Sequence, residues 1–465
     1  MITLLRSIRR VLTPRISSLP ILCGRASASQ SWRMAAGAAV LLLAAAPPAA
    51  SQATTGASGG LRLGALYAAA DRANPRITAA DALATAAQAR VPGSRRPPDP
   101  QLQLGFMNRS LPGLGPMDIV GMTQLQVMQM VPTGGKLGLA GEAAAARATG
   151  AHERATDIRW DVRERVAAAF YDVYRTERSI AIALETRRLL DDVASTSESM
   201  YRVGEATQAD VLKARVEIAR MTEEIVAMRA MRLVNLARLG GLLDQPVDSS
   251  TALAVLPAFP DTLPSADSLM HQATVSRPMV RAGEADLTAA QADTRRAWRE
   301  LWPDLQVGVQ YGQRGGMDGV ERMASLMVGA SIPVFAKSRQ LRMRDEADAM
   351  QAMASADLKS MRADTRARVG EVHVEWVRAR NLSALYRTTI LPQARAAVTA
   401  SLAAYRVGQV NVMTLLDNQM TVNRYTQELA ALEAAEGMAL ADLEMLLGRE
   451  LFDPNTGRPA PGGDR

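Results

Sequence analysis

The chain repeats itself once, at a spacing close to 203 residues, and this feature constrains its fold more than any other. Thr85–Ala89 recurs as Thr288–Ala292, and Tyr201–Gly204 recurs unchanged as Tyr405–Gly408. Further matches keep the same order: Asn74-Pro75 with Arg277-Pro278, Pro100–Gly105 with Pro303–Gly308, Pro132 and Lys136 with Pro333 and Lys337, and Asp161–Val166 with Asp364–Val369. The chain is therefore expected to hold two tandem copies of one unit, so that structure in one copy predicts structure in the other.

The basic charge of the chain belongs to its first 50 residues. They hold six arginines and no lysine, aspartate or glutamate, so that the net charge of +7 falls to +1 for the rest. This removes the electrostatic case for a nucleic-acid partner. The apolar run Ala35–Ala46 fits the hydrophobic region of a secretory signal peptide, assigned to residues 1–53, although a buried N-terminal helix remains an alternative. Cys23, the only cysteine, lies inside it behind the bulky Leu22, so neither a lipid anchor nor a disulfide is expected.

Each unit is expected to open with a helix, at about 77–91 and 279–299, and to continue with two alternating strands. Leucine, valine and aromatic residues alternate with Gln, Gly, Ser and Met around 101–106 and 305–311, and again in return strands at 121–131 and 323–332. Gly/Pro-rich turns are predicted at 108–118 and 312–319. Strands of this length suit a transmembrane barrel with an apolar face toward lipid, although a soluble hairpin with one buried face has the same pattern. Four strands cannot close a barrel, so a membrane location requires oligomers, whose copy number the residues do not fix.

A very long helix is predicted after each hairpin, from 138 to 201 and from 338 to 405, with a kink at Pro392. Each long helix stops at Arg-Val-Gly and restarts toward returning helices at about 208–240 and 412–447. Gly204 and Gly408 suit the left-handed backbone conformation that often ends a helix. The expected caps of the returning helices are Thr207 with Asp210, which resembles a capping box, and Asn411. Each unit therefore contains an antiparallel helical hairpin with a tight tip, and helices of this length indicate coiled-coil packing.

Together these motifs resemble the TolC-like outer-membrane efflux protein family over about residues 61–450. The most specific are Asn74-Pro75, Val131–Lys136 (VPTGGK) and the paired Tyr-Arg-Val-Gly tips. The resemblance implies a mainly α fold with a small β part, a homotrimer with a twelve-stranded outer-membrane β-barrel, and a periplasmic α-helical coiled-coil barrel. It implies a passive exit duct of a tripartite efflux or secretion system, which contacts outer-membrane lipid and works with a periplasmic adaptor and an inner-membrane pump. By match to the motif, the adaptor contacts fall on Arg202, Val203, Gly204, Arg406, Val407 and Gly408.

The resemblance and the repeat together predict the division of the chain. The expected parts are the signal peptide at 1–53, repeat 1 at 61–240 with its barrel hairpin at 100–131 and helical hairpin at 137–240, a linker at 241–265, repeat 2 at 266–450 with its barrel hairpin at 303–333 and helical hairpin at 338–448, and a disordered tail at 451–465. One departure from the family is that Ala394–Ala404 carries Arg395 and no acidic residue, which argues against a cation-selecting ring there.

The sequence offers no pattern that predicts an enzyme, a cofactor or a metal site. His152, His271 and His373 lack metal-ligand spacing, and Gly134-Gly135-Lys136 lacks the spacing of a phosphate loop. The 24 methionines suggest a Cu(I) relay, with Met122, Met128 and Met130 on one face of a strand, but packing filler is the favoured interpretation. The main alternative function is a soluble periplasmic coiled-coil adaptor or scaffold.

Overall fold

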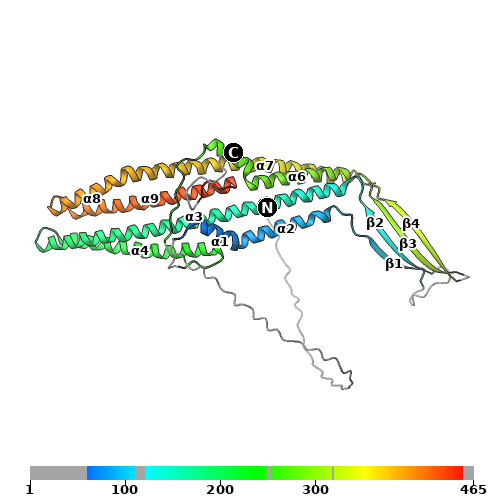
Figure 1. Cartoon of the computed structure of the whole chain (residues 1–465), viewed down its shortest axis with the longest axis horizontal. Coiled ribbons are helices and arrows are strands. Elements are labelled where there is room, and N and C mark those ends of the chain that lie inside the picture. Colours follow the sequence, from blue (N-terminus) through cyan, green and yellow to red (C-terminus); the bar gives the residue numbers. More distant parts are fainter. Residues whose placement is uncertain (1–59, 110–120, 249–252, 317–318, 454–465) are drawn as a thin grey trace, which may run out of the picture. The chain divides into compact units, whose positions relative to one another are not determined.

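The computed structural model describes residues 60–109, 121–248, 253–316 and 319–453, all within the compact unit Gly56–Arg465. The expected signal peptide with Cys23 lies outside these residues, as does most of the turn expected at 108–118. The described chain is mainly helical with one small sheet, and its elements follow one another in the same order in both repeats (Figure 1).

The helices of the two repeats correspond, and their ends lie at local sequence signals. In repeat 1 they are α1 (Leu63–Ala73), α2 (Pro75–Ser94), α3 (Lys136–Arg202) and α4 (Gln208–Leu243). In repeat 2 they are α5 (Ala266–Ser276), α6 (Pro278–Arg299), α7 (Gln340–Leu385), the π-helical turn η2 (Tyr386–Ile390), α8 (Leu391–Arg406) and α9 (Val412–Leu447). The second long helix is thus interrupted just before Pro392, where the proline lacks the N–H group that a regular α-helix needs. The predicted long and returning helices are confirmed, within a few residues.

The four strands form one antiparallel meander in the order β1-β2-β3-β4. They are β1 (Gln101–Met107), β2 (Met122–Val131), β3 (Leu305–Gly316) and β4 (Gly319–Ala330). The inner pairing of β2 with β3 joins the two repeats, with Val127 opposite Val309. The turn predicted at 312–319 is wrong for most of its length, because β3 continues through its glycines to Gly316. A glycine inside a strand often marks a place where another group approaches the backbone, and the side chain of Met122 covers Gly312 here.

The hydrophobic core joins the repeats around α3 and α9. One cluster packs α1, α3, α4 and α9 together, a second packs α5 and α7 against α9, and a third joins the tip ends of α3 and α4 to α8 and α9. Phe452 is buried in the second cluster, so the disordered tail expected at 451–465 does not begin at residue 451. Residues 454–465 lie outside the described residues.

Candidate functional site

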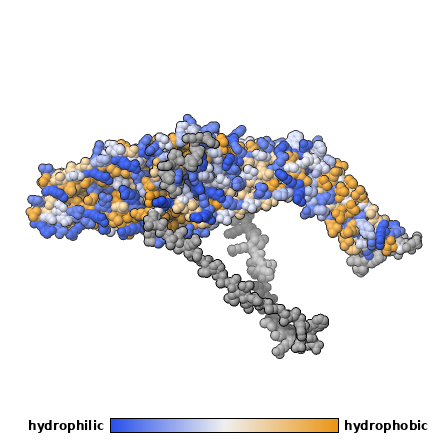
Figure 2. Space-filling model, in the orientation of Figure 1, coloured by the Kyte–Doolittle hydropathy of each residue, from blue (hydrophilic) through white to orange (hydrophobic). Residues whose placement is uncertain are grey.

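The sheet has one apolar face, and this face is exposed. Strand alternation and register place Leu102, Val127, Val309 and Leu326 in one row, and Leu104, Leu125, Tyr311 and Ala324 in the next. The larger of these side chains are all exposed, Leu326 to 72%. Figure 2 shows hydrophobic residues gathered over the strands. Large exposed apolar patches mark contact with protein or membrane, and three of the four strands here, β2 to β4 with 10 to 12 residues, are long enough to cross a bilayer.

The opposite face of the sheet carries glutamine, methionine and glycine in place of aliphatic residues. Its rows are Gln101–Met128–Gly308–Met327, Gln103–Gln126–Gln310–Ser325, Gly105–Gln124–Gly312–Met323 and Met107–Met122–Arg314–Glu321. The charged residues of these rows, Arg314 and Glu321, form an ion pair with each other at 2.6 Å. The face is therefore polar but nearly without net charge.

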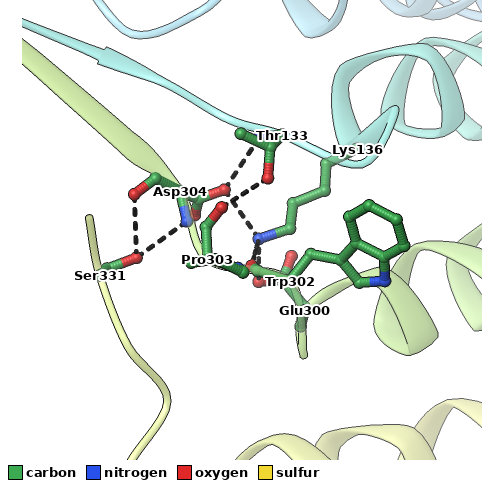
Figure 3. A network of polar contacts seen from close by, with 7 residues as sticks. All are labelled: Thr133, Lys136, Glu300, Trp302, Pro303, Asp304 and Ser331. Atoms are coloured by element: carbon green, nitrogen blue, oxygen red, sulfur yellow. Dashed lines mark hydrogen bonds and ion pairs between the residues drawn. The ribbon is translucent and has the colours of Figure 1, made fainter. Parts of the chain in front are cut away.

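A buried lysine joins the first repeat to the second where α3 begins (Figure 3). The Nζ atom of Lys136 lies 2.8 Å from Asp304 and 3.4 Å from Glu300, and it donates to the carbonyl oxygen of Trp302 at 3.0 Å. Asp304 also accepts from the backbone N–H of Thr133 at 3.1 Å. Since Asp304 directly precedes β3, these bonds fix the start of the long helix against the start of a strand in the other repeat. The sequence matched Lys136 to Lys337 but gave no sign of this pairing.

The glycines of the VPTGGK motif build the corner that puts Lys136 in this position. Gly134 and Gly135 both have positive φ, at 67° and 75°, which side chains disfavour. A Cβ on Gly134 would lie 3.4 Å from the indole ring of Trp302. The motif is thus a tight, left-handed corner packed on an aromatic ring.

The two helical tips have the geometry of helix ends with exposed apolar side chains. Gly204 and Gly408 have φ of 79° and 70°, and each N–H bonds back to the tyrosine three residues earlier. Thr207 accepts from the N–H of Asp210 while the Asp210 carboxylate accepts from the N–H of Thr207, and Asn411 accepts from the N–H of Thr414. Val203 and Val407 are 71% and 68% exposed, and Arg202 and Arg406 are exposed beside them.

The same tip motif is buried differently in the two repeats. Tyr405 is 4% exposed and its hydroxyl hydrogen-bonds to the hydroxyl of Ser197 at 2.7 Å, whereas Tyr201 is 47% exposed. Between the two hairpins, α4 and α9 line a groove of about 820 Å³. Its mouth carries charges of both signs, including Lys213, Arg220 and Asp417. The tips therefore present two exposed valines and one exposed tyrosine, next to a groove of mixed charge.

Buried polar groups lie where α3 meets α9, away from the sheet. Glu444 accepts from the N–H groups of Leu451 and Phe452. Burial raises the pKa of Glu444 to about 7, against the lowering effect of these two hydrogen bonds. Burial also raises the pKa of Tyr171, whose hydroxyl has no hydrogen-bond partner. These groups are enclosed in the helical core, so they are structural features and not part of an accessible site.

The described residues contain neither a metal-binding cluster nor a helix that could span a membrane. No cluster of three or more histidine, cysteine or acidic side chains could hold a metal ion there. Across the same part of the chain, each helix is either too short or too polar to span a bilayer.

Comparison with known proteins agrees with the resemblance. Residues 66–244 and 269–449 match the family described as outer membrane efflux protein. A relative from Pseudomonas putida, the pyoverdine export outer membrane protein OpmQ, is 25% identical over 296 residues, which span 61% of this chain and 61% of the relative. The chain thus covers about three fifths of the length of that relative.

Solved structures share the fold at lower identity. The outer membrane protein VceC from Vibrio cholerae matches with a TM-score of 0.72 and 17% identity, over 83% of this chain and 96% of that one. The MtrE outer membrane channel of Neisseria gonorrhoeae in its open state matches with a TM-score of 0.70 and 16% identity, over 85% and 90%. The family match covers well over half of the residues, and the chain therefore belongs to the outer membrane efflux protein family, a TolC-like family located in the outer membrane.

Proposed function

We propose that this chain is the exit duct of a tripartite efflux or secretion system, which assembles as a homotrimer and conducts its cargo passively. The two-faced sheet carries the proposal. Its apolar face would contact lipid while the Gln/Met/Gly face lines the pore. Open sheet edges are not tolerated in lipid, and four strands cannot close on themselves. Because the meander alternates in direction, β4 of one copy can pair antiparallel with β1 of the next, and three copies supply twelve strands.

The internal repeat supplies a template for the contact between copies. Within the chain α3 packs on α6, and a Cβ on Gly150 would lie 3.3 Å from the carboxylate of Asp286. At the repeat spacing of 203 residues, the equivalent of Gly150 in the second repeat is Met353 on α7, and the equivalent of Asp286 in the first repeat is Leu83 on α2. Both of these side chains are more than half exposed in the single chain. In the proposed trimer, α2 of a second copy would therefore pack against α7, as α6 packs against α3.

The tip tyrosines supply a second, independent template. Within the chain Tyr405 bonds to Ser197. At the repeat spacing of 204 residues, the equivalent of Tyr405 is Tyr201 and the equivalent of Ser197 is Ser401. In the single chain Tyr201 is half exposed, while the hydroxyl of Ser401 is buried and accepts from the side-chain amide of Asn418. The equivalent bond would therefore come from a second copy, and Ser401 would have to exchange its present partner for Tyr201. Both templates lead from the second repeat of one copy to the first repeat of the next. Such a head-to-tail contact builds a ring when its rotation closes, as it would after three copies in the proposed trimer.

The tips are the proposed contact with a periplasmic adaptor, through Arg202, Val203 and Gly204 and through Arg406, Val407 and Gly408. Their support is the exposure of both valines and the groove between α4 and α9 that lies next to them. Helix ends also expose backbone groups that a partner can satisfy. In this scheme an inner-membrane pump supplies the energy, and the duct only provides a continuous wall.

A cysteine pair tests the ring directly. Leu83→Cys with Met353→Cys should form disulfides between copies under oxidation, giving a covalent trimer on a non-reducing gel. The chain's one natural cysteine, Cys23, lies in the expected signal peptide and should not interfere. Each single substitution is the matched control and should yield no more than covalent dimers.

Fractionation of the same cells separates the duct from the alternative of a soluble periplasmic adaptor. The duct should remain with the outer membrane until detergent is added. A double-cysteine protein that is released without detergent and stays monomeric after oxidation would contradict the proposal.

A further inference from the structure

The Gln/Met/Gly face of the sheet, which would line the pore, is rich in methionines. The register places six of them on this face: Met107, Met122, Met128, Met130, Met323 and Met327. They come from β1, β2 and β4, so they gather only through the tertiary fold. We call these six side chains the methionine face. The sequence suggested three of them, on β2 alone.

Four of these methionines lie beside two glycines of β3, Gly308 and Gly312. A Cβ on Gly308 would lie 3.3 Å from Cγ of Met128 and 3.5 Å from Cε of Met327, so side chains from the strands on either side both lie next to this one residue. At Gly312 the same position lies 3.1 Å from Sδ of Met122. Both glycines are buried although the strand around them is largely exposed.

The partners in the register complete two pairs. Met128 and Met327 are both directly opposite Gly308, from β2 and β4. Met323 is directly opposite Gly312, which Met122 covers. Two thioethers from different strands thus flank each glycine on the same face.

The charges of this face disfavour a site for hard cations on the described strands. Its acidic residue, Glu321, is neutralised by Arg314. The other polar groups are the hydroxyl of Ser325 and neutral amides, such as Gln310, which donates to Gln124. Ca²⁺ and Mg²⁺ usually need carboxylates among several oxygen ligands, and the described strands offer only amide and hydroxyl oxygens and the paired Glu321 on this face. Neutral thioethers are instead soft ligands, which select Cu(I) and similar d¹⁰ ions.

We propose that the pairs Met128–Met327 and Met122–Met323 bind soft monovalent cations, Cu(I) or Ag(I), at the wall of the pore. The binding itself does not depend on the duct, but its orientation toward the pore and its use in passage rest on the proposed function. Two uncharged sulfur ligands would hold such an ion without a counter-charge, and therefore reversibly. This suits a surface that passes cargo along.

The competing explanation is that the methionines only fill space above glycine, since methionine adapts to irregular gaps. The two explanations predict different effects of replacing these methionines with leucine. Leucine keeps nearly the same volume and apolar character but has no sulfur, so it preserves packing and removes metal binding.

The test compares two quadruple variants of the full chain, purified in detergent. The face variant carries Met→Leu at positions 122, 128, 323 and 327. The control variant carries Met→Leu at Met221, Met228, Met420 and Met438, which pack in the helical core clusters. Equilibrium dialysis against silver nitrate counts the Ag⁺ retained per chain, X-ray absorption identifies the ligand atoms, and Zn²⁺ serves as the hard-ion comparison.

The wild type and the control variant should retain about two more Ag⁺ per chain than the face variant, bound through sulfur, and none should retain Zn²⁺ at this face. Equal Ag⁺ retention by the face variant and the wild type would overturn the proposal. The cysteine cross-link reports separately on the duct. If the Ag⁺ difference is absent but the covalent trimer forms, only the metal site is contradicted. If the Ag⁺ difference is present but no covalent trimer forms, only the duct is contradicted.

Discussion

The contact between Gly437 on α9 and Tyr171 on α3 predicts a large effect from a single added methyl group. A Cβ on Gly437 would lie 2.2 Å from Cζ, 2.4 Å from Cε1 and 2.7 Å from Cε2 of the tyrosine ring. The ring is fully buried, with Phe170 at 5.2 Å and Phe259 at 6.2 Å between ring centroids. It cannot turn away without moving these neighbours, so Gly437→Ala should force the two helices apart.

The size of the effect follows from two opposing contributions. Overpacking a core by one methyl group costs about 1–3 kcal/mol, and three contacts below 3 Å place this case at or above the upper limit. Alanine in place of glycine gains about 1 kcal/mol of helix propensity. The net loss of folding free energy is therefore about 2 kcal/mol, or roughly thirtyfold in the folded-to-unfolded ratio.

Thermal unfolding of purified protein, followed by circular dichroism at the helix band, measures this loss. Gly241→Ala is the matched control, because it adds the same methyl group to helix α4 with no atom within 4 Å. It should keep or raise the melting temperature. Tyr171→Phe should not rescue Gly437→Ala, since Cζ remains, whereas Tyr171→Val should rescue it in part. A Gly437→Ala protein as stable as Gly241→Ala would refute the reasoning.

Three further predictions concern the lysine network, a buried carboxyl and the tips. Lys136→Met should cost about 3 kcal/mol in unfolding free energy, because it leaves two acidic groups without their cation, while Lys136→Arg should cost less; equal losses would contradict the network. The pKa of Glu444 is raised in the folded protein to about 7 from its usual 4.5, so its contribution to stability is complete below pH 4.5 and is lost as pH rises through 7. Melting temperatures of Glu444→Gln should match the wild type near pH 4.5 and exceed it at pH 8. Gly204→Pro with Gly408→Pro should abolish efflux in cells and leave trimers assembled, since proline cannot adopt positive φ; full efflux would remove the tips as adaptor contacts.

Several features could be predicted from short stretches of sequence. The capping residue Thr207 and the glycines of the tips act on backbone groups within a few residues, so their effects are visible locally. The alternation in β2 likewise gave the two faces of the sheet correctly. Where the local signal was ambiguous it misled: the glycines of β3 suggested a turn but lie within a strand, because their open space is filled by methionines from neighbouring strands.

The sequence by itself determined the duplication, the succession of helices and strands and the helix ends, because these depend on spacing and propensity over a few residues. Only the tertiary structure decided which distant residues lie together: Lys136 with Asp304, Ser197 with Tyr405, and both Met128 and Met327 beside Gly308. The identical tip motifs make the point most directly, since Tyr405 is buried and Tyr201 is not. Burial is a property of what packs against a side chain, and those neighbours come from the other repeat or, in the proposed ring, from another copy of the chain.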